Sequence, residues 1–239
     1  MSAGLAVWLG LVAVSFTVTA VDVLRHPNRD MPIMNAVWPL MALYFGPLGV
    51  LSYVLLSRRV RYTYVRARPV LPSRVTPVPG HAHGGIHALG RMRDPLWVRS
   101  MRSTTHCMAG CALGDLTAMV LAAFGWLGAV GMGKELFLGA VFAFAFGLFV
   151  FQALPVMAER RIGFAQSLGI AFQADLYTIV AYLVGQIPAF YILTAGAAMS
   201  GMGLVGSHLV DMQASMAVGF LTSYPVNYVL VAKGVKHGM

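Results

Sequence analysis

The chain has 239 residues, of which 58% are hydrophobic and only 10% are charged. A soluble domain carries roughly 25% charged residues, so the composition argues against a water-soluble enzyme. Lysine and arginine outnumber aspartate and glutamate by 17 to 8. Most of these basic residues fall in one loop, which indicates membrane topology rather than nucleic-acid binding. With only two cysteines, a secreted disulfide framework is excluded as well. The composition predicts an integral membrane protein.

Six apolar segments are long enough to cross a bilayer as helices, which takes about 20 residues each. We expect them over residues 3–24, 34–57, 104–130, 136–157, 166–193 and 208–232. The first lacks a basic start and a small-residue cleavage site, which favours a retained helix over a signal peptide. The second is interrupted by Pro39 and Pro47. The pattern predicts an all-α, six-transmembrane-helix bundle.

The connection over residues 58–103 is basic and rich in Pro, Gly and Arg, and it lacks the apolar periodicity of a core. If it is cytoplasmic, the opposite side holds just three basic residues: Arg25, Arg29 and Lys134. This bias follows the positive-inside rule. It predicts a protein of the cytoplasmic membrane with both termini in the cytoplasm.

The same loop divides one membrane domain into residues 1–57, with the first two spans, and residues 104–239, with the other four and a short tail. It contains His81, His83 and His87. These histidines suit either a flexible linker or a weak metal-collecting arm, because short histidine tracts can bind metal.

The third span carries the most informative pattern. Cys107, Cys111 and Asp115 are spaced four apart, so they share one helix face, and His106 precedes them at its inner mouth. An ionisable side chain within a membrane is costly and normally faces the protein interior. Gly110 and Gly114 form a GxxxG pattern that allows another helix to approach closely.

The two thiols favour a soft metal over a disulfide. On a regular helix their Cα atoms lie roughly 6 Å apart with side chains that do not meet at disulfide geometry. Thiolates and thioethers select Cu(I), which could bridge Cys107 and Cys111 with His106 as a further ligand. The alternative is a purely structural role for the pair.

Methionines suggest an outer continuation of this site. His208, Met212 and Met216 form a second stripe spaced four apart, and Met34 and Met41 enter the second span from the same, outer side. Packing explains most single methionines. Thioethers outside and thiols inside nevertheless suit a Cu(I) path, since thioethers remain ligands in an oxidising compartment.

Three intramembrane acids are candidates for an ion or proton relay: Asp115, Asp175 and Asp211. We expect Asp115 and Asp175 near the midplane, because they lie at similar distances from the inner ends of their spans. Hydrogen bonding between helices is the alternative role.

Three blocks carry a resemblance to a known family. They are the stretch from Met34 to Gly49, the motif His-Cys-x-x-Gly-Cys-x-x-Gly-Asp over residues 106–115, and the stretch from Met212 to Asn227. In these blocks the chain resembles a bacterial integral-membrane family known as domain of unknown function 4396. The resemblance implies a membrane protein and transfers no activity.

We therefore expect membrane transport or binding of a soft metal ion, Cu(I), by a transporter or metal-binding protein rather than an enzyme. Its partners would be the lipid bilayer, the metal ion, and a second copy of the chain or copper-handling proteins, with no nucleic acid. One alternative is a thiol-redox protein using Cys107 and Cys111 with a quinone or haem. Another is a structural subunit of a membrane complex.

Overall fold

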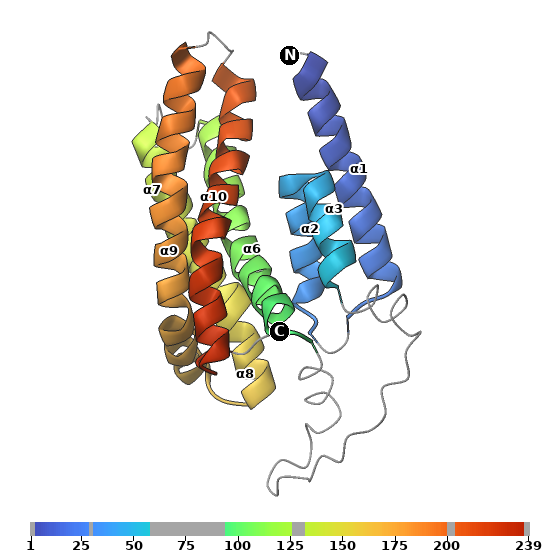
Figure 1. The fold of residues 1–239 in the computed structure, drawn as a ribbon, viewed down its shortest axis with the longest axis vertical. Helices are drawn as coiled ribbons and strands as arrows, with labels where there is room; N and C mark the ends of the chain where they lie inside the picture. The colour runs from blue at the N-terminus through green and yellow to red at the C-terminus, as the bar shows by residue number, and fades with distance from the viewer. Residues whose placement is uncertain (1–2, 29–30, 58–93, 126–131, 200–203, 237–239) are drawn as a thin grey trace, which may run out of the picture.

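The computed structural model describes residues 3–28, 31–57, 94–125, 132–199 and 204–236, and these residues are helical with no strand among them. The helices in chain order are α1 (Ala3–Arg25), α2 (Met34–Phe45), α3 (Pro47–Leu56), α6 (Leu96–Ala123), α7 (Met132–Ala145), the π-helix η1 (Phe146–Ala153), α8 (Leu154–Arg160), α9 (Phe164–Met199) and α10 (Leu204–Ala232). Helices α6, α7, α9 and α10 form a bundle, and α1 stands beside it with α2 and α3 (Figure 1).

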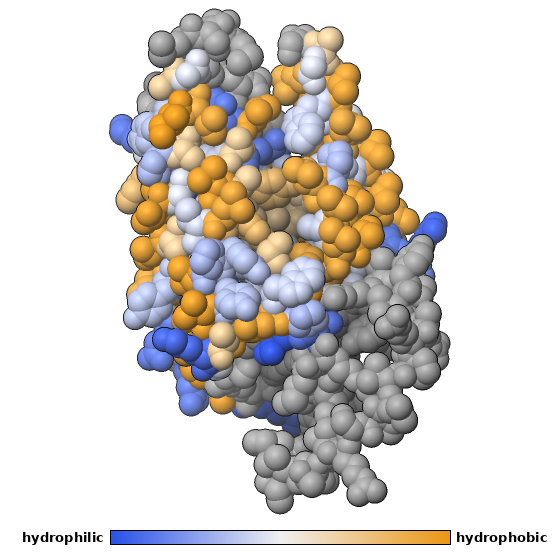
Figure 2. All heavy atoms as spheres, in the orientation of Figure 1, coloured by the Kyte–Doolittle hydropathy of each residue, from blue (hydrophilic) through white to orange (hydrophobic). Residues whose placement is uncertain are grey.

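Five stretches of the described helices are long and apolar enough to cross a membrane: Ala3–Arg25, Leu96–Ala123, Gly133–Ala158, Asp175–Gly196 and Val210–Ala232. Hydrophobic side chains cover the sides of the bundle, and hydrophilic ones gather at the end that holds α8 (Figure 2). This agrees with the predicted all-helical membrane class. The prediction of six spans is not confirmed, because residues 34–57 do not form one helix.

The segment expected as the second span is a helical hairpin. Trp38 and Tyr53 pack edge to face with ring centroids 5.6 Å apart. On one continuous helix these 15 positions would be about 22 Å apart. The chain turns at Gly46, whose φ of 55° and ψ of −129° suit glycine, and Pro47 then opens α3. Pro39, in contrast, lies inside α2 without ending it.

The hairpin enters and leaves the bundle at the same end. Its helices of 12 and 10 residues are about 18 and 15 Å long, roughly half of the ~30 Å hydrocarbon core. One consequence is that the start of α1 and the end of α10 lie at opposite ends of the molecule (Figure 1). The expected placement of both termini in the cytoplasm is therefore not confirmed.

Polar contacts hold both ends of the hairpin. At its base, Arg102 Nε donates to Leu56 O at 2.5 Å, and the same guanidinium pairs with Asp94. At its tip, Gln213 Nε2 donates to Tyr44 O at 2.5 Å. Trp8 Nε1 donates to Gln213 Oε1 at 3.0 Å, which joins α1 to the same contact. The tip is thereby fixed inside the molecule, where an irregular backbone is tolerated.

Helix α6 begins earlier than expected. It starts at Leu96, so the last residues of the expected 58–103 loop are helical, and Arg102 is buried rather than part of a solvated loop. His81, His83 and His87 lie outside the described residues.

The GxxxG pattern works as predicted. A methyl group on Gly110 would approach Gly147 Cα to 2.5 Å, and one on Gly114 would come closer still to Ala143 N. Only glycine at these two positions lets α6 touch the backbone of α7 and η1.

Candidate functional site

A buried group of polar side chains lies towards the C-terminal end of the bundle. We call it the Lys236 cluster, and its members are His106, Cys107, Gln152, Asp175 and Lys236. Lys236 Nζ donates to Cys107 Sγ at 2.7 Å and forms an ion pair with Asp175. Gln152 Nε2 donates to Cys107 Sγ at 3.0 Å, and that sulfur lies 3.2 Å from Asp175 Oδ1. All five side chains are buried, with 8% or less of their surface exposed.

Four separate elements supply this cluster. Helix α6 carries Cys107, η1 carries Gln152 and α9 carries Asp175. Lys236 follows the end of α10, where Gly234 has a left-handed φ of 69° and turns the chain back. The Val235 and Lys236 amides then both donate to Leu230 O, at 3.0 and 3.2 Å. This turn places the lysine beside the bundle interior rather than in the surrounding water.

The ion pair keeps Lys236 charged. Burial alone would lower its pKa, but the neighbouring Asp175 and Cys107 outweigh this and raise the pKa above the ordinary value. A buried pair of this kind stabilises a fold only while both partners are present, because either charge alone would be buried without compensation.

Two atoms of the cluster have unused hydrogen-bonding capacity. Asp175 Oδ2 and His106 Nε2 are buried with no hydrogen-bond partner among the described residues, whereas most buried polar atoms have one. Gln152 Nε2 lies 3.3 Å from His106 Nδ1. With the amide donating there, the ring proton belongs on Nε2, which makes His106 a donor rather than a ready metal ligand.

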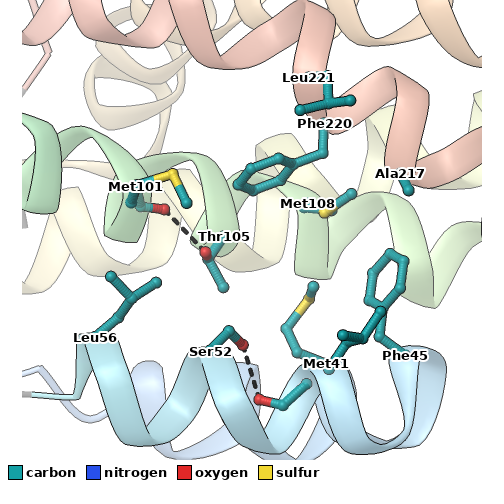
Figure 3. A pocket seen from close by; sticks show the side chains of 12 residues that line it. Met41, Phe45, Ser52, Leu56, Met101, Thr105, Met108, Ala217, Phe220 and Leu221 are labelled. Atoms are coloured by element: carbon teal, nitrogen blue, oxygen red, sulfur yellow. Dashed lines mark hydrogen bonds between the residues drawn. The ribbon is translucent and has the colours of Figure 1, made fainter.

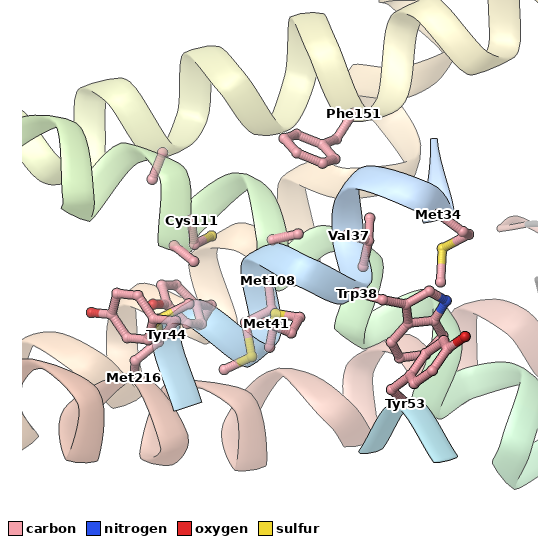
Figure 4. Packing of buried hydrophobic residues seen from close by; sticks show 14 of the residues in the cluster. Met34, Val37, Trp38, Met41, Tyr44, Tyr53, Met108, Cys111, Phe151 and Met216 are labelled. Atoms are coloured by element: carbon pink, nitrogen blue, oxygen red, sulfur yellow. The ribbon is translucent and has the colours of Figure 1, made fainter. Parts of the chain in front are cut away.

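A second group lies further along α6, and we call it the midway cluster: Cys111, Asp115, Gln186, Met212 and Met216. Gln186 Nε2 donates to Asp115 Oδ2 at 2.8 Å and lies 3.8 Å from Met212 Sδ. All five side chains are buried. Figure 4 shows Met41, Met108 and Met216 around Cys111, with Tyr44 of the hairpin tip close by. The cysteine and methionine stripes thus meet in one core, as the path hypothesis requires.

A small cavity lies between the two clusters. Its volume is about 10 Å³, and both Cys107 and Cys111 line it, together with Thr178, Tyr182 and Ser223. A space of this size holds about one water molecule. Both cysteines are free and buried, so they form no disulfide with each other. The cavity is large enough for a single small ion between two thiols.

Hydrogen bonds fix the helices around this cavity. Asn227 Nδ2 donates to Thr104 Oγ1 at 3.0 Å, and Thr178 Oγ1 donates to Asn227 Oδ1 at 3.2 Å. These bonds join α6, α9 and α10, as expected for an amide within a span.

A larger and almost wholly apolar cavity of about 290 Å³ separates the hairpin from α6 and α10 (Figure 3). Met41, Phe45, Met101, Met108 and Phe220 are among its lining residues. Its lining includes no charged side chain, so it differs in chemistry from the two polar clusters.

The model of a family described as "Domain of unknown function (DUF4396)" matches residues 96–236. The chain belongs to this family. No curated protein and no solved structure matches the chain. The DUF4396 region runs from the first residue of α6 to Lys236 and so contains both polar clusters, whereas α1 and the hairpin lie outside it.

The DUF4396 fold places the predicted acids at different depths. Asp175 lies level with Cys107, while Asp115 lies level with Gln186, which is eleven residues, or about 16 Å, further along α9. The two acids are therefore not level with each other, and their place relative to the membrane midplane stays a prediction. Asp211 is buried in α10 next to Met212.

The methionines divide into two groups. Met212 and Met216 approach from the far end of α10, and Met41 reaches the same core from the hairpin. Met34 begins α2, at the end of the molecule where α10 ends (Figure 1). Its entry from the outer side stays a prediction.

The remaining expectations are partly outside the structure. His208 belongs to α10, but its side chain is not described. Among the described residues, no three His, Cys, Asp or Glu side chains are grouped as a metal site. Sequence reasoning missed Gln152, Gln186 and Lys236; amides within apolar spans were the available signal for the first two.

Proposed function

We propose that this protein transports or binds a soft cation, most simply Cu(I), along a path that runs from Met216 and Met212 past Cys111 to Cys107. The observation that carries the proposal is the cavity of about 10 Å³ lined by both thiols. Thiols and thioethers are the donors that Cu(I) prefers. Cu(I) would be cargo rather than a resident cofactor; at the cavity the coordinating sulfurs would come from Cys107 and Cys111, and Met216 would bind it further along the path.

The acids give this path its charge balance. Asp115 is held by Gln186 beside Met212, and Asp175 lies 3.2 Å from the Cys107 sulfur. Each carboxylate thus lies near one sulfur-containing side chain of the proposed path. Intramembrane acids in such places commonly mark ion pathways, and a relay through Asp115, Asp175 and Asp211 remains part of the proposal.

The hairpin favours transport over a scaffold role. Non-helical backbone at membrane depth is tolerated where protein buries it or a cavity adjoins it. Broken helices that end halfway across are characteristic of transporter binding sites. Here the tip residue Tyr44 lies beside the midway cluster, and Gln213 binds its carbonyl.

We further propose that the end of the molecule that holds Arg25, Arg102 and Lys236, which we call the basic end, faces the cytoplasm of the bacterial cell and that the start of α1 lies outside. With a hairpin instead of a second span, Arg25 at the end of α1 lies at the same end as Arg102 near the start of α6, and Lys134 near the start of α7 lies at the opposite end. This distribution fits the positive-inside rule better than six spans do.

The test is copper loading of the purified protein under reducing conditions. We expect about one Cu(I) per chain, because one cavity lies between the thiols, and its loss in Cys107→Ser/Cys111→Ser. The matched control is Ser223→Ala, which lines the same cavity but removes no sulfur. A flux assay in proteoliposomes then separates transport from storage.

Two results would count against the proposal. Equal copper in the double variant would place the metal elsewhere. Absence of copper from every sample would leave the thiol-redox alternative, which rests on two free cysteines that line one cavity; quinone reduction and thiol titration would then decide.

A further inference from the structure

The C-terminal tail introduces a positive charge into the proposed path. Lys236 has 5% of its surface exposed. Its ammonium lies 2.7 Å from Cys107 Sγ and pairs with Asp175. Cys107 is the last sulfur of the path before the basic end. The ammonium therefore occupies the position that a cation would have to pass when it enters or leaves there.

The groups around the ammonium suit a cation in general. Asp175 supplies a carboxylate, and Cys107 supplies a soft sulfur. Asp175 is 1% exposed, and its Oδ2 has no hydrogen-bond partner among the described residues. The site thus has capacity beyond the lysine: an oxygen remains for a second ligand contact.

The lysine is attached in a way that allows it to leave. It lies beyond the end of α10, after a turn in which Lys233, Gly234 and Val235 are exposed. Moving it out breaks the hydrogen bonds that the Val235 and Lys236 amides donate to Leu230 O, together with the side chain's contacts with Cys107 and Asp175. No membrane-spanning helix has to shift.

We propose that Lys236 is a built-in counter-ion that closes the basic end of the path, and that a cation arriving at Cys107 replaces its ammonium and releases the tail. This inference rests on the proposed function. A monovalent cation such as Cu(I) would leave Asp175 with a positive partner, so the exchange avoids an uncompensated buried carboxylate. Binding of a cation at Cys107 would thereby be coupled to opening of the basic end of the path.

Amine acylation followed by mass spectrometry tests the exchange on the full chain, and the exposed Lys233 serves as an internal control. Without copper we expect Lys236 to react at least about a hundredfold more slowly than Lys233, because its reaction requires a local opening that also breaks the buried ion pair with Asp175. Added Cu(I) should bring the Lys236 rate close to that of Lys233, whose own rate stays constant. In Cys107→Ser the copper effect should disappear.

Copper affinity gives a second readout. Lys236→Leu removes the internal competitor without adding a sulfur ligand. If the tail is open about 1% of the time, the variant should bind Cu(I) about a hundredfold more tightly. Lys233→Leu is the matched control and should bind like the unaltered chain.

The outcomes separate the two proposals. Copper bound with unchanged Lys236 labelling, and with equal affinity in Lys236→Leu, overturns the counter-ion and leaves the transport proposal standing. No copper bound by the unaltered chain overturns the proposed function, and this inference with it. If Lys236→Leu does not fold, labelling of the unaltered chain still decides.

Discussion

Replacing Asp175 by asparagine tests the most consequential contact of the structure. The carboxylate is 1% exposed and Lys236 is 5% exposed, so solvent cannot take over the role of either partner. The asparagine side chain would keep the volume but leave the ammonium buried without a counter-charge. Removing one partner of a buried pair costs about 3–5 kcal/mol. We expect Asp175→Asn to lower the free energy of unfolding by that amount.

The double variant Asp175→Asn/Lys236→Met supplies the decisive comparison. With both charges gone the cost should fall well below that of Asp175→Asn alone, because no buried charge is left without a partner. Reversible unfolding of all four proteins in mixed micelles gives the coupling energy, and Lys233→Met serves as the neutral control. If Asp175→Asn cost less than about 1 kcal/mol, or if the two single effects simply added, the buried pair would not exist as described.

Three further results are expected. Gly114→Ala should destabilise the chain by about 1–3 kcal/mol, because the new methyl group overpacks against Ala143 N. Gly169→Ala, where no atom lies within 4 Å of the new methyl group, should leave the stability unchanged. Thermal unfolding in detergent compares the two variants. Arg102→Met should loosen the base of the hairpin, and limited proteolysis should show faster cleavage near it; unchanged cleavage would contradict the anchoring role. Because the pKa of Lys236 is raised above 10.5, the stabilisation of the fold by its ion pair should be complete below about pH 10.5 and fade at higher pH. If the free energy of unfolding of Lys236→Met fell in the same way at alkaline pH, this prediction would be refuted.

Parts of this structure follow directly from local sequence patterns. The four-residue spacing of Cys107, Cys111 and Asp115 places them on one buried face, because helical periodicity alone decides that. The glycines Gly110 and Gly114 contact the backbone of η1 and α7 for the same reason, because two small residues at this spacing create a flat strip on the helix.

Other parts depend on direction, which hydropathy does not report. Residues 34–57 are apolar enough to cross, and nothing in their composition distinguishes a crossing from a return at Gly46. That single turn brings the end of α3 back to the end of the molecule at which α2 begins (Figure 1). The position of Asp175 along its span likewise depends on where α9 begins. The helix starts at Phe164, and Asp175 is the first residue of its apolar stretch Asp175–Gly196.

Lys236 was hidden for a different reason. Lysine near the end of a last span is the ordinary sign of a cytoplasmic tail, and sequence reasoning used it only in that sense. Its burial depends on a left-handed Gly234 and on a carboxylate 61 positions earlier. Contacts over such distances follow from the packed fold rather than from any local pattern.

The hairpin also has a consequence for biogenesis. Its tip is held by Gln213, which follows Tyr44 by 169 residues. At about 5–20 residues per second, a ribosome delivers that partner roughly 8–34 seconds after the tip itself. Helices of 12 and 10 residues are too short to span the bilayer on their own. The nascent hairpin must therefore wait, and the step that completes this protein is the late docking of an early segment onto helices made after it.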